Sequence, residues 1–274
     1  MKTKVFNYLG MMLLASISFI SCNDEESIAP IERGEKVLIR MEQQYWDIIG
    51  NKKYIKTTTY SYDSNNNISS INVSDPNKES SWSYDVDGDR LTSDKYGVVE
   101  YKLNNAKYIE EFTDHSYSSG SSFKFNYHSS GYLKTSFLIG GNYEQVMFEP
   151  IYDKQWRITD NTKGNLKSFE CIWSDIPNKG NLFLWDIVNP GTLFYNYITH
   201  DEDVIILANA GLYGKAQAFL PKRISDDTES LDYTGYEFEY ELDKDGYVTQ
   251  ATMMRVNISD YDKKVVAVFK FTYE

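Results

Sequence analysis

Short segments of the chain alternate large aromatic residues with small polar ones. In one of them Tyr60 and Tyr62 flank Ser61, so both rings project to one face of a β-strand while the serine faces the other. Asp63 and the asparagines at 65–67 follow directly. These residue types favour a tight turn, because Asp bonds to the backbone ahead of it and Asn tolerates a positive φ. Alternation then resumes, so the pattern predicts a hairpin of strand, turn and strand.

The hairpin unit recurs along the chain. Its copies begin at Tyr60, Trp82, Tyr101 and Phe123, more weakly at Ile151 and Trp173, and clearly again at Tyr236. The first four starts are 22, 19 and 22 residues apart, which is the length of one hairpin and its connection. The sequence therefore predicts an all-β fold, an antiparallel meander of repeated hairpins curled into an open or partly closed barrel.

Alternation extends to both ends of this region. Val37, Ile39 and Met41 predict an opening strand, with Leu38 as an exception to the pattern, and residues 266–273 predict a closing one. Residues 199–221 have a different pattern of polar and apolar residues. Acidic residues before an apolar stretch with a later glycine favour a short helix, whereas the β-branched run favours a strand. Both alternatives stay open, so we expect at most one short helix.

The N-terminus has the features of an export signal. Lys2 and Lys4 precede an apolar run that ends at Ile20, and this run is too short for a stable transmembrane span. The residues before Cys22 resemble a bacterial lipobox, although Phe19 and Ser21 depart from its usual form. The resemblance implies a signal peptide at 1–21 and lipidation of Cys22, by palmitate among other acyl chains, so that the membrane is a partner through this anchor.

An acidic segment follows the predicted lipidation site. Residues 23–26 read Asn-Asp-Glu-Glu and resemble the surface-export tag of lipoproteins in one large group of gut Gram-negative bacteria. The alternative is a solvated acidic linker behind a cleaved signal. We therefore predict an acidic tether at 22–34 and a single β-meander domain at 35–274, anchored in the outer membrane and facing the cell exterior.

Composition narrows the classes of function. The 274 residues carry 28 Lys and Arg against 40 Asp and Glu, a formal charge of −12, so there is no basic surplus for a nucleic-acid partner. Two cysteines and three histidines leave little for a disulfide framework or a zinc site. We expect no metal and no cofactor. Cys171 lies between aromatic residues and is predicted to be a buried, inert thiol.

No motif points to catalysis. The segment at 85–89 has the acidic residues of a cation loop, but its glycine falls at position 4 rather than 6, which favours a hairpin turn over a calcium site. His115, His128 and His200 are expected to be solvated loop residues. There is no nucleophile elbow, zinc-protease motif or phosphate loop. Paired carboxylates need only spatial proximity, so a hydrolase stays a third hypothesis behind a non-enzymatic protein.

The aromatic residues have two interpretations. The chain contains 23 Tyr, 14 Phe and 5 Trp, and most must form the core because large aliphatic residues are few. Rings left exposed on a sheet could stack on sugars. The weak candidates for such binding are Trp82, Tyr84, Trp156, Trp173 and Trp185.

Two resemblances follow from these motifs. The pairs Tyr62-Asp63, Tyr84-Asp85 and Tyr152-Asp153 resemble the tyrosine-aspartate (YD) repeat of large secreted bacterial shell proteins. The chain as a whole resembles a family of gut-bacterial lipoproteins, a domain of unknown function with a porin-like β fold. The features that carry this resemblance are the lipobox, the meander, Gly-Leu-Tyr-Gly-Lys at 211–215, Leu-Pro-Lys-Arg-Ile at 220–224 and the last hairpin. The resemblance implies a fold and a compartment, and no catalytic residues.

Three hypotheses for the function follow. The first is a lipid-anchored surface protein that binds an extracellular glycan or another polymer without enzymatic activity. The second is a structural or assembly lipoprotein that partners an outer-membrane protein complex, by way of an exposed strand edge. The third is the hydrolase.

Overall fold

The computed structural model describes most of the chain after the predicted tether. The described residues are 35–46, 53–76, 79–94, 99–113, 122–140, 143–161, 169–184, 202–226, 234–257 and 263–274. Cys22, Trp185, His115 and His200 lie outside them. Among the described residues, no helix has both the length and the apolar character that a membrane span requires.

The described elements are one helix and seventeen strands, and each hairpin of the meander pairs consecutive strands. They are β1 (Leu38–Trp46), β2 (Lys53–Tyr62), β3 (Ile68–Asp75), β4 (Ser80–Asp87), β5 (Arg90–Ser93), β6 (Val99–Leu103), β7 (Ile109–Thr113), β8 (Ser122–Tyr127), β9 (Leu133–Gly140), β10 (Tyr143–Phe148), β11 (Pro150–Tyr152), β12 (Ile158–Asn161), β13 (Phe169–Pro177), α2 (Glu202–Asn209), β14 (Phe219–Asp226), β15 (Thr234–Leu242), β16 (Val248–Asn257) and β17 (Lys263–Tyr273).

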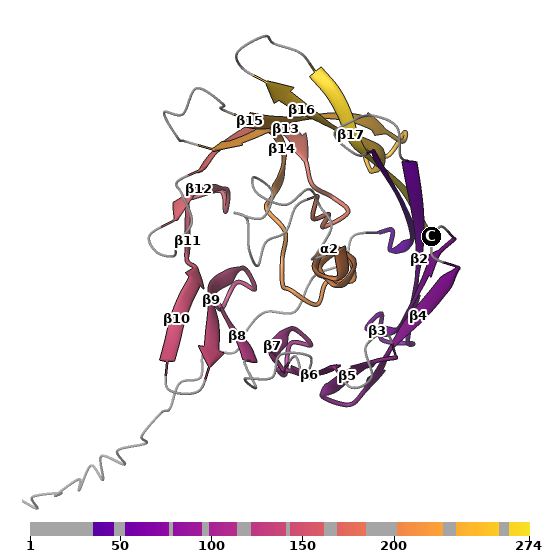
Figure 1. Cartoon of the computed structure of the whole chain (residues 1–274), viewed down its shortest axis with the longest axis vertical. Helices are drawn as coiled ribbons and strands as arrows, with labels where there is room; N and C mark the ends of the chain where they lie inside the picture. Colours follow the sequence, from indigo (N-terminus) through magenta and orange to yellow (C-terminus); the bar gives the residue numbers. More distant parts are fainter. Residues whose placement is uncertain are drawn as a thin grey trace, which may run out of the picture.

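Fifteen of the strands form one antiparallel sheet. Neighbours in the sheet are neighbours in sequence, except where β1 pairs with β17 and so joins the two ends of the domain. The sheet ends at β10 and β13, and the separate hairpin β11–β12 lies between them in the chain. The strands curve into a ring (Figure 1). The predicted meander, curled into a barrel that does not fully close, is confirmed.

The alternation of aromatic and polar residues orients each strand. Tyr60, Ile71 and Tyr84 are register partners on β2, β3 and β4, and all three are buried. Their neighbours Ser61 and Asn72 are exposed. Since successive side chains point to opposite faces, the aromatic residues form the inner face of the ring and the small polar residues form its outer face.

Charged pairs cross the outer face between neighbouring strands. Arg90 on β5 lies 2.8 Å from Glu100 on β6, and Lys102 on β6 lies 2.9 Å from Glu110 on β7. Strands that cross a membrane in a barrel carry apolar residues on their outward face and polar ones inside. The arrangement in these strands is the reverse, so their outer face suits water.

The opening strand departs from the predicted pattern at its start. Leu38, the expected exception, is buried, because the register of β1 against β17 shifts between Leu38 and Arg40. Val37 and Ile39 are only half-buried. From Met41 onward every second residue is buried, namely Met41, Gln43 and Tyr45, and Gln44 on the opposite face is buried as well.

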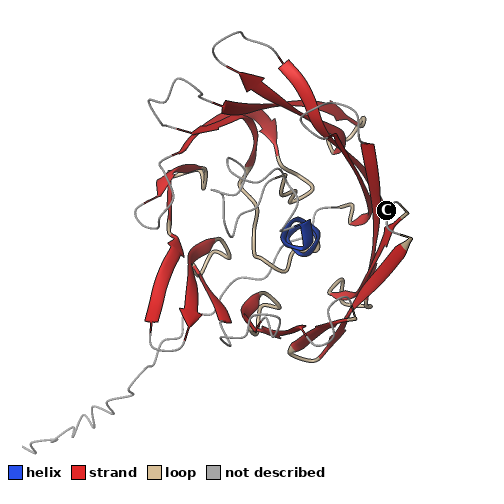
Figure 2. Ribbon diagram, viewed as in Figure 1, coloured by secondary structure: helices blue, strands red, loops and turns tan. Residues whose placement is uncertain are grey.

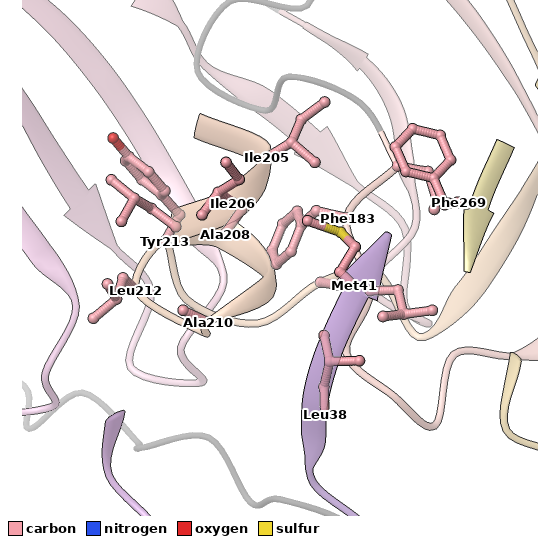
Figure 3. Packing of buried hydrophobic residues seen from close by; sticks show 14 of the residues in the cluster. Leu38, Met41, Phe183, Ile205, Ile206, Ala208, Ala210, Leu212, Tyr213 and Phe269 are labelled. Atoms are coloured by element: carbon pink, nitrogen blue, oxygen red, sulfur yellow. The ribbon is translucent and has the colours of Figure 1, made fainter. Parts of the chain in front are cut away.

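The interior of the ring contains α2 and the chain that follows it (Figure 2). Ile206 on α2 belongs to the same buried cluster as Phe183, Met41 on β1 and Phe269 on β17 (Figure 3). The open choice for residues 199–221 is thus settled in favour of a short helix over Glu202–Asn209. The apolar residues of this helix pack in the core against the aromatic side chains on the inner face of the sheet.

One predicted hairpin does not form. The unit that begins at Trp173 has its strand, β13, and its turn, but residues 182–184 after the turn are not a strand. Leu182, Phe183 and Leu184 are instead buried in the core cluster. Their aliphatic and aromatic side chains do not alternate with polar ones, which explains why this copy was weak.

Candidate functional site

One end of the ring is built from a repeated five-residue turn. It occurs at 63–67, 104–108, 128–132, 153–157 and 243–247, with a related turn at 178–182. In each complete copy the first residue donates its N–H to the carbonyl of the fifth, and the fourth donates to the carbonyl of the first. The fourth residue always has a positive φ; these residues are Asn66, Lys107, Gly131, Trp156, Asn181 and Gly246.

The side chain of the first residue explains the sequence preference of the turn. The Oδ1 atom of Asp63 accepts the backbone N–H groups of Asn65 and Asn67 at 2.8 and 2.9 Å. Asn104 accepts two equivalent bonds from Ala106 and Tyr108. Hydrogen bonds, first that from the backbone of Asn67, lower the pKa of the Asp63 carboxyl. These bonds within the turn explain why Asp or Asn is favoured at its first position.

The segment after α2 crosses this turn end and is bonded to it. The N–H of Ile109 donates to the carbonyl of Leu212 at 2.7 Å, and the N–H of Lys215 donates to the carbonyl of Gly131 at 2.9 Å. Further along, the N–H of Ala216 donates to Oδ1 of Asn181 at 2.8 Å. Residues 210–216 thus connect turns that are far apart in sequence.

A cavity of about 350 Å³ opens where two turns meet this segment. Its lining comes from the turn at 63–67, the turn at 104–108 and the chain just after α2: Asn65, Asn66, Asn67, Ile68, Ala106, Lys107, Tyr108, Ala210, Gly211 and Leu212. Ile68 and Leu212 are buried, whereas Asn65 and Asn66 are exposed. The cavity therefore has apolar side chains at depth and amide groups toward solvent.

The chemistry of this lining suits a neutral polar ligand. Each asparagine amide can both donate and accept hydrogen bonds. Burial raises the pKa of Tyr108, so its hydroxyl stays neutral. The Lys107 ammonium donates to the carbonyl of Gly88 at 2.7 Å, which directs its charge to the neighbouring hairpin. None of the described lining residues carries a carboxylate. The cavity can bind hydroxyl groups but supplies no acid–base pair for hydrolysis.

A cluster of four rings lies at the next two turns. Tyr132 and Trp156 stack with their centroids 4.5 Å apart and their planes 4° from parallel. His128 meets Trp156 edge-on at 5.4 Å, and Tyr152 lies 5.5 Å from the same ring. All four are half-buried. His128 lies in a turn, as expected, but it is half-buried rather than fully solvated, because neighbouring aromatic rings pack against it.

The structure places the predicted ligand-binding residues in different environments. Trp82 is 6% exposed and Tyr84 is fully buried, so both pack in the core. Trp156 belongs to the four-ring cluster, and the half-buried Trp173 donates its Nε1–H to the carbonyl of Ile158 at 3.0 Å. Trp185 lies outside the described residues. Binding by any of these side chains stays a prediction.

The sequence pattern indicated exposed rings as binding groups and gave no direct indication of the cavity. The polar residues that line it are turn residues, and their role in the turn already explains why they occur in the sequence. One signal was present: Lys107 occupies a position of the turn where Asn or Gly is favoured. That departure becomes visible only when the turns are aligned with one another.

Other sequence expectations concern catalysis and metals. The acidic segment at 85–89 forms the hairpin between β4 and β5, with Asp87 paired to Arg90 and Gly88 at a φ of 63°. In the described part of the chain, no three His, Cys, Asp or Glu side chains gather in a way that could hold a metal ion. Cys171, expected to be buried, is half-buried against the core.

Comparisons with known proteins show a likeness in fold. No protein-family model matches the chain, and no curated protein matches it. A solved structure described as TcdB2-TccC3-TEV is 8% identical over 80% of this chain and 14% of that chain, with a TM-score of 0.26, which is too low to support an argument. A crystal structure of a porin-like protein from Bacteroides uniformis ATCC 8492 is 15% identical, covers 86% of this chain and 98% of that one, and has a TM-score of 0.65. At that identity the likeness shows the fold alone: this chain has a β fold similar to that of a bacterial porin-like protein, as the family resemblance implied.

Proposed function

We propose that this protein is a non-enzymatic lipoprotein of the bacterial outer surface that binds a sugar unit of an extracellular glycan in the cavity at its turn end. The cavity of about 350 Å³, with amide groups toward solvent and apolar side chains at depth, is the observation that carries the proposal. Its volume lies at the small end of the range for ligand sites. It therefore fits one sugar ring better than a long segment of polymer.

The character of the ring's outer face supports an anchored protein. Charged pairs such as Arg90–Glu100 lie on the outer face of β5 to β7, whereas a membrane-spanning strand exposes apolar residues to lipid. Attachment to the membrane then has to come from elsewhere in the chain. The lipobox-like sequence before Cys22 supplies a candidate, and the acidic residues after it favour export to the cell surface.

The binding proposal is tested on the full chain in detergent with soluble polysaccharides. Dextran, α-mannan and arabinoxylan serve as neutral probes in affinity gel electrophoresis. Asn66→Gly removes an amide from the cavity, and glycine suits the φ of 61° at this position. We expect retardation by at least one probe and its loss in this variant.

The matched control is Asn105→Gly, the same substitution at an exposed turn residue that does not line the cavity. It should bind as the unaltered chain does. Equal binding by the Asn66→Gly variant would refute the cavity as the site. Absence of retardation in every gel would refute glycan binding.

Anchoring is tested separately by Cys22→Ser. This change should abolish incorporation of labelled palmitate and move the protein from the membrane fraction to the soluble fraction. Protease treatment of intact cells then tests the orientation, because a surface protein is degraded and a protein that faces the periplasm is protected.

A second candidate function is docking of an outer-membrane protein. It is favoured by apolar side chains that are exposed on the strands next to the opening of the sheet. Tyr143 on β10, Ile151 on β11 and Ile172 on β13 are 54%, 38% and 41% exposed. Strand edges with apolar neighbours suit pairing with a partner strand. An outer-membrane protein that docks here should give one reproducible product when a photo-cross-linker replaces Tyr143. A scatter of weak products would count against it.

A further inference from the structure

The five complete turns and the related one define a consensus that three residues break. The first position is Asp or Asn in all but one of the six, and the fourth is Asn or Gly in all but two. Both preferences have a physical basis, because Asp and Asn accept backbone N–H groups and Asn and Gly tolerate a positive φ. The exceptions are His128 at a first position and Lys107 and Trp156 at fourth positions.

Each exception lies at a site described above. Lys107 lines the cavity, and the rings of His128 and Trp156 contact each other at 5.4 Å. Departures from a local sequence rule that gather in one place are expected at functional positions rather than at purely structural ones. The turn at 153–157 would close with asparagine or glycine at 156, so the fold does not require tryptophan there.

Tryptophan at position 156 strains the backbone of the turn. Its φ is 57°, in the left-handed region that bulky side chains rarely adopt. In return its ring is held flat against Tyr132, with planes 4° apart. Tyr152 belongs to the same cluster, and its hydroxyl donates to the carbonyl of Leu133 at 2.9 Å. The pair is thus preformed and half-buried.

This pair is close to the cavity. Leu212 lines the cavity, and three residues later Lys215 bonds to Gly131 in the turn that carries His128 and Tyr132. Three residues span at most about 11 Å. A ligand that occupies the cavity and also reaches the aromatic pair therefore has to span a distance of this order.

We propose that Tyr132, Trp156 and His128 form a second subsite, which stacks on a pyranose ring next to the sugar held in the cavity. The inference rests on the proposed function and extends it from one sugar unit to a short stretch of chain. Aromatic faces bind the apolar C–H face of a sugar, and the polar edges of tyrosine and histidine bond to its hydroxyl groups. The formal charge of −12 repels acidic polymers, so the glycan is a neutral one.

Trp156→Gly separates a binding role from a structural one. Glycine relieves the left-handed backbone while it removes the ring. We expect Tm to fall by less than about 5 °C and binding to the retarding polysaccharide to weaken about 3- to 10-fold. Trp156→Tyr keeps an aromatic face and should recover part of the affinity. Val265→Ala, at an exposed side chain of β17 that belongs to none of these turns, should leave binding unchanged.

The outcomes are distinguishable from those of the cavity test. A Trp156→Gly variant that binds as tightly as the unaltered chain overturns the second subsite and leaves the cavity proposal standing. A fall in Tm beyond about 5 °C shows that the ring is needed for the fold and also overturns it. Retardation by polygalacturonate equal to that by the neutral probes refutes the preference for neutral glycans. If no polysaccharide retards the unaltered chain, both proposals fail together.

Discussion

The hydroxyl of Tyr127 donates a hydrogen bond of 2.7 Å to the carbonyl oxygen of Ile109, across two hairpins of the meander. Tyr127 is the last residue before one turn, and Ile109 is the first after the previous one. Tyr152 makes the same contact with Leu133, one hairpin further along. The tyrosine that precedes a turn therefore fastens its hairpin to the one before, which gives the aromatic repeat a polar function besides packing.

We expect Tyr127→Phe to lower the free energy of unfolding by about 1–2 kcal/mol, because a buried carbonyl loses its donor. Burial raises the pKa of Tyr127, so the effect should not depend on pH below the alkaline range. Urea denaturation of both proteins measures it. Tyr143→Phe at an exposed position is the control, and equal stabilities in both variants would contradict the role of the hydroxyl.

The ion pair of Asp243 with Lys36 predicts a dependence of stability on pH. The Lys36 ammonium lies 2.6 Å from the Asp243 carboxylate and, with backbone N–H groups, lowers its pKa to about 2. A depressed folded-state pKa stabilises the protein above the unfolded value of about 3.9. That stabilisation is lost as pH falls from about 4 to 2.

Asp243→Asn isolates this effect, because an amide oxygen can still accept the N–H groups of Asp245 and Tyr247. The difference in Tm between the two proteins should be constant above pH 5 and should shrink between pH 4 and 2. Asp175→Asn, at an exposed carboxylate on β13, is the comparison. A difference that persists at pH 2 would exclude the ion pair as its source.

Two glycines allow the cost of a positive φ to be separated from the cost of a close contact. Gly88 has a φ of 63° and open space around an added Cβ, whereas at Gly214 the φ is 85° and the Cβ would lie 2.5 Å from the carbonyl oxygen of Gly131. Gly88→Ala should cost about 1 kcal/mol and Gly214→Ala roughly 3 kcal/mol or more. Calorimetry on both variants checks the order, and similar losses would show that residues 210–216 do not lie tightly on the turn end.

A buried amide at the end of α2 ties the helix to residue 183. Asn209, buried at the end of α2, accepts the N–H of Phe183 at 3.1 Å and donates to the carbonyls of Phe183 and Ile205, each at 2.8 Å. Asn209→Ala leaves these buried groups without the amide and should cost about 2–4 kcal/mol. Asn72→Ala on the exposed face of β3 should cost less than about 0.5 kcal/mol. Loss of stability of the same size in both would refute the role of this amide.

Most of the architecture follows from local sequence signals. The alternation around Tyr60 and Tyr236 and the Asp or Asn after it determine strands, faces and turns, because a strand has a period of two and the turn needs only its own side chain. The same signal fails where it is weak. After Trp173 the chain turns, but residues 182–184 are uniformly apolar and enter the core instead of a return strand.

The candidate site was less predictable than the fold. The sequence around an aromatic residue such as Tyr84 alternates in the same way whether its side chain is buried or exposed. Tyr84 is buried only because other elements of the fold pack over it. The asparagines at 65–67 were predicted as turn residues, which they are, and nothing local shows that Leu212 comes to lie beside them.

The sequence by itself determined the repeated hairpins, the turn at the end of each and the paired rings on one face, because these depend on residues within about ten positions of one another. The tertiary structure decided which way that face points, that β1 closes on β17, and that α2 lies within the ring. It also decided that Lys107, His128 and Trp156, three departures spread over 50 residues, gather at one end. The reason is physical: a period of two orients a strand relative to its neighbours, whereas closure and the placement of the helix depend on how the apolar surface of the whole chain is removed from water.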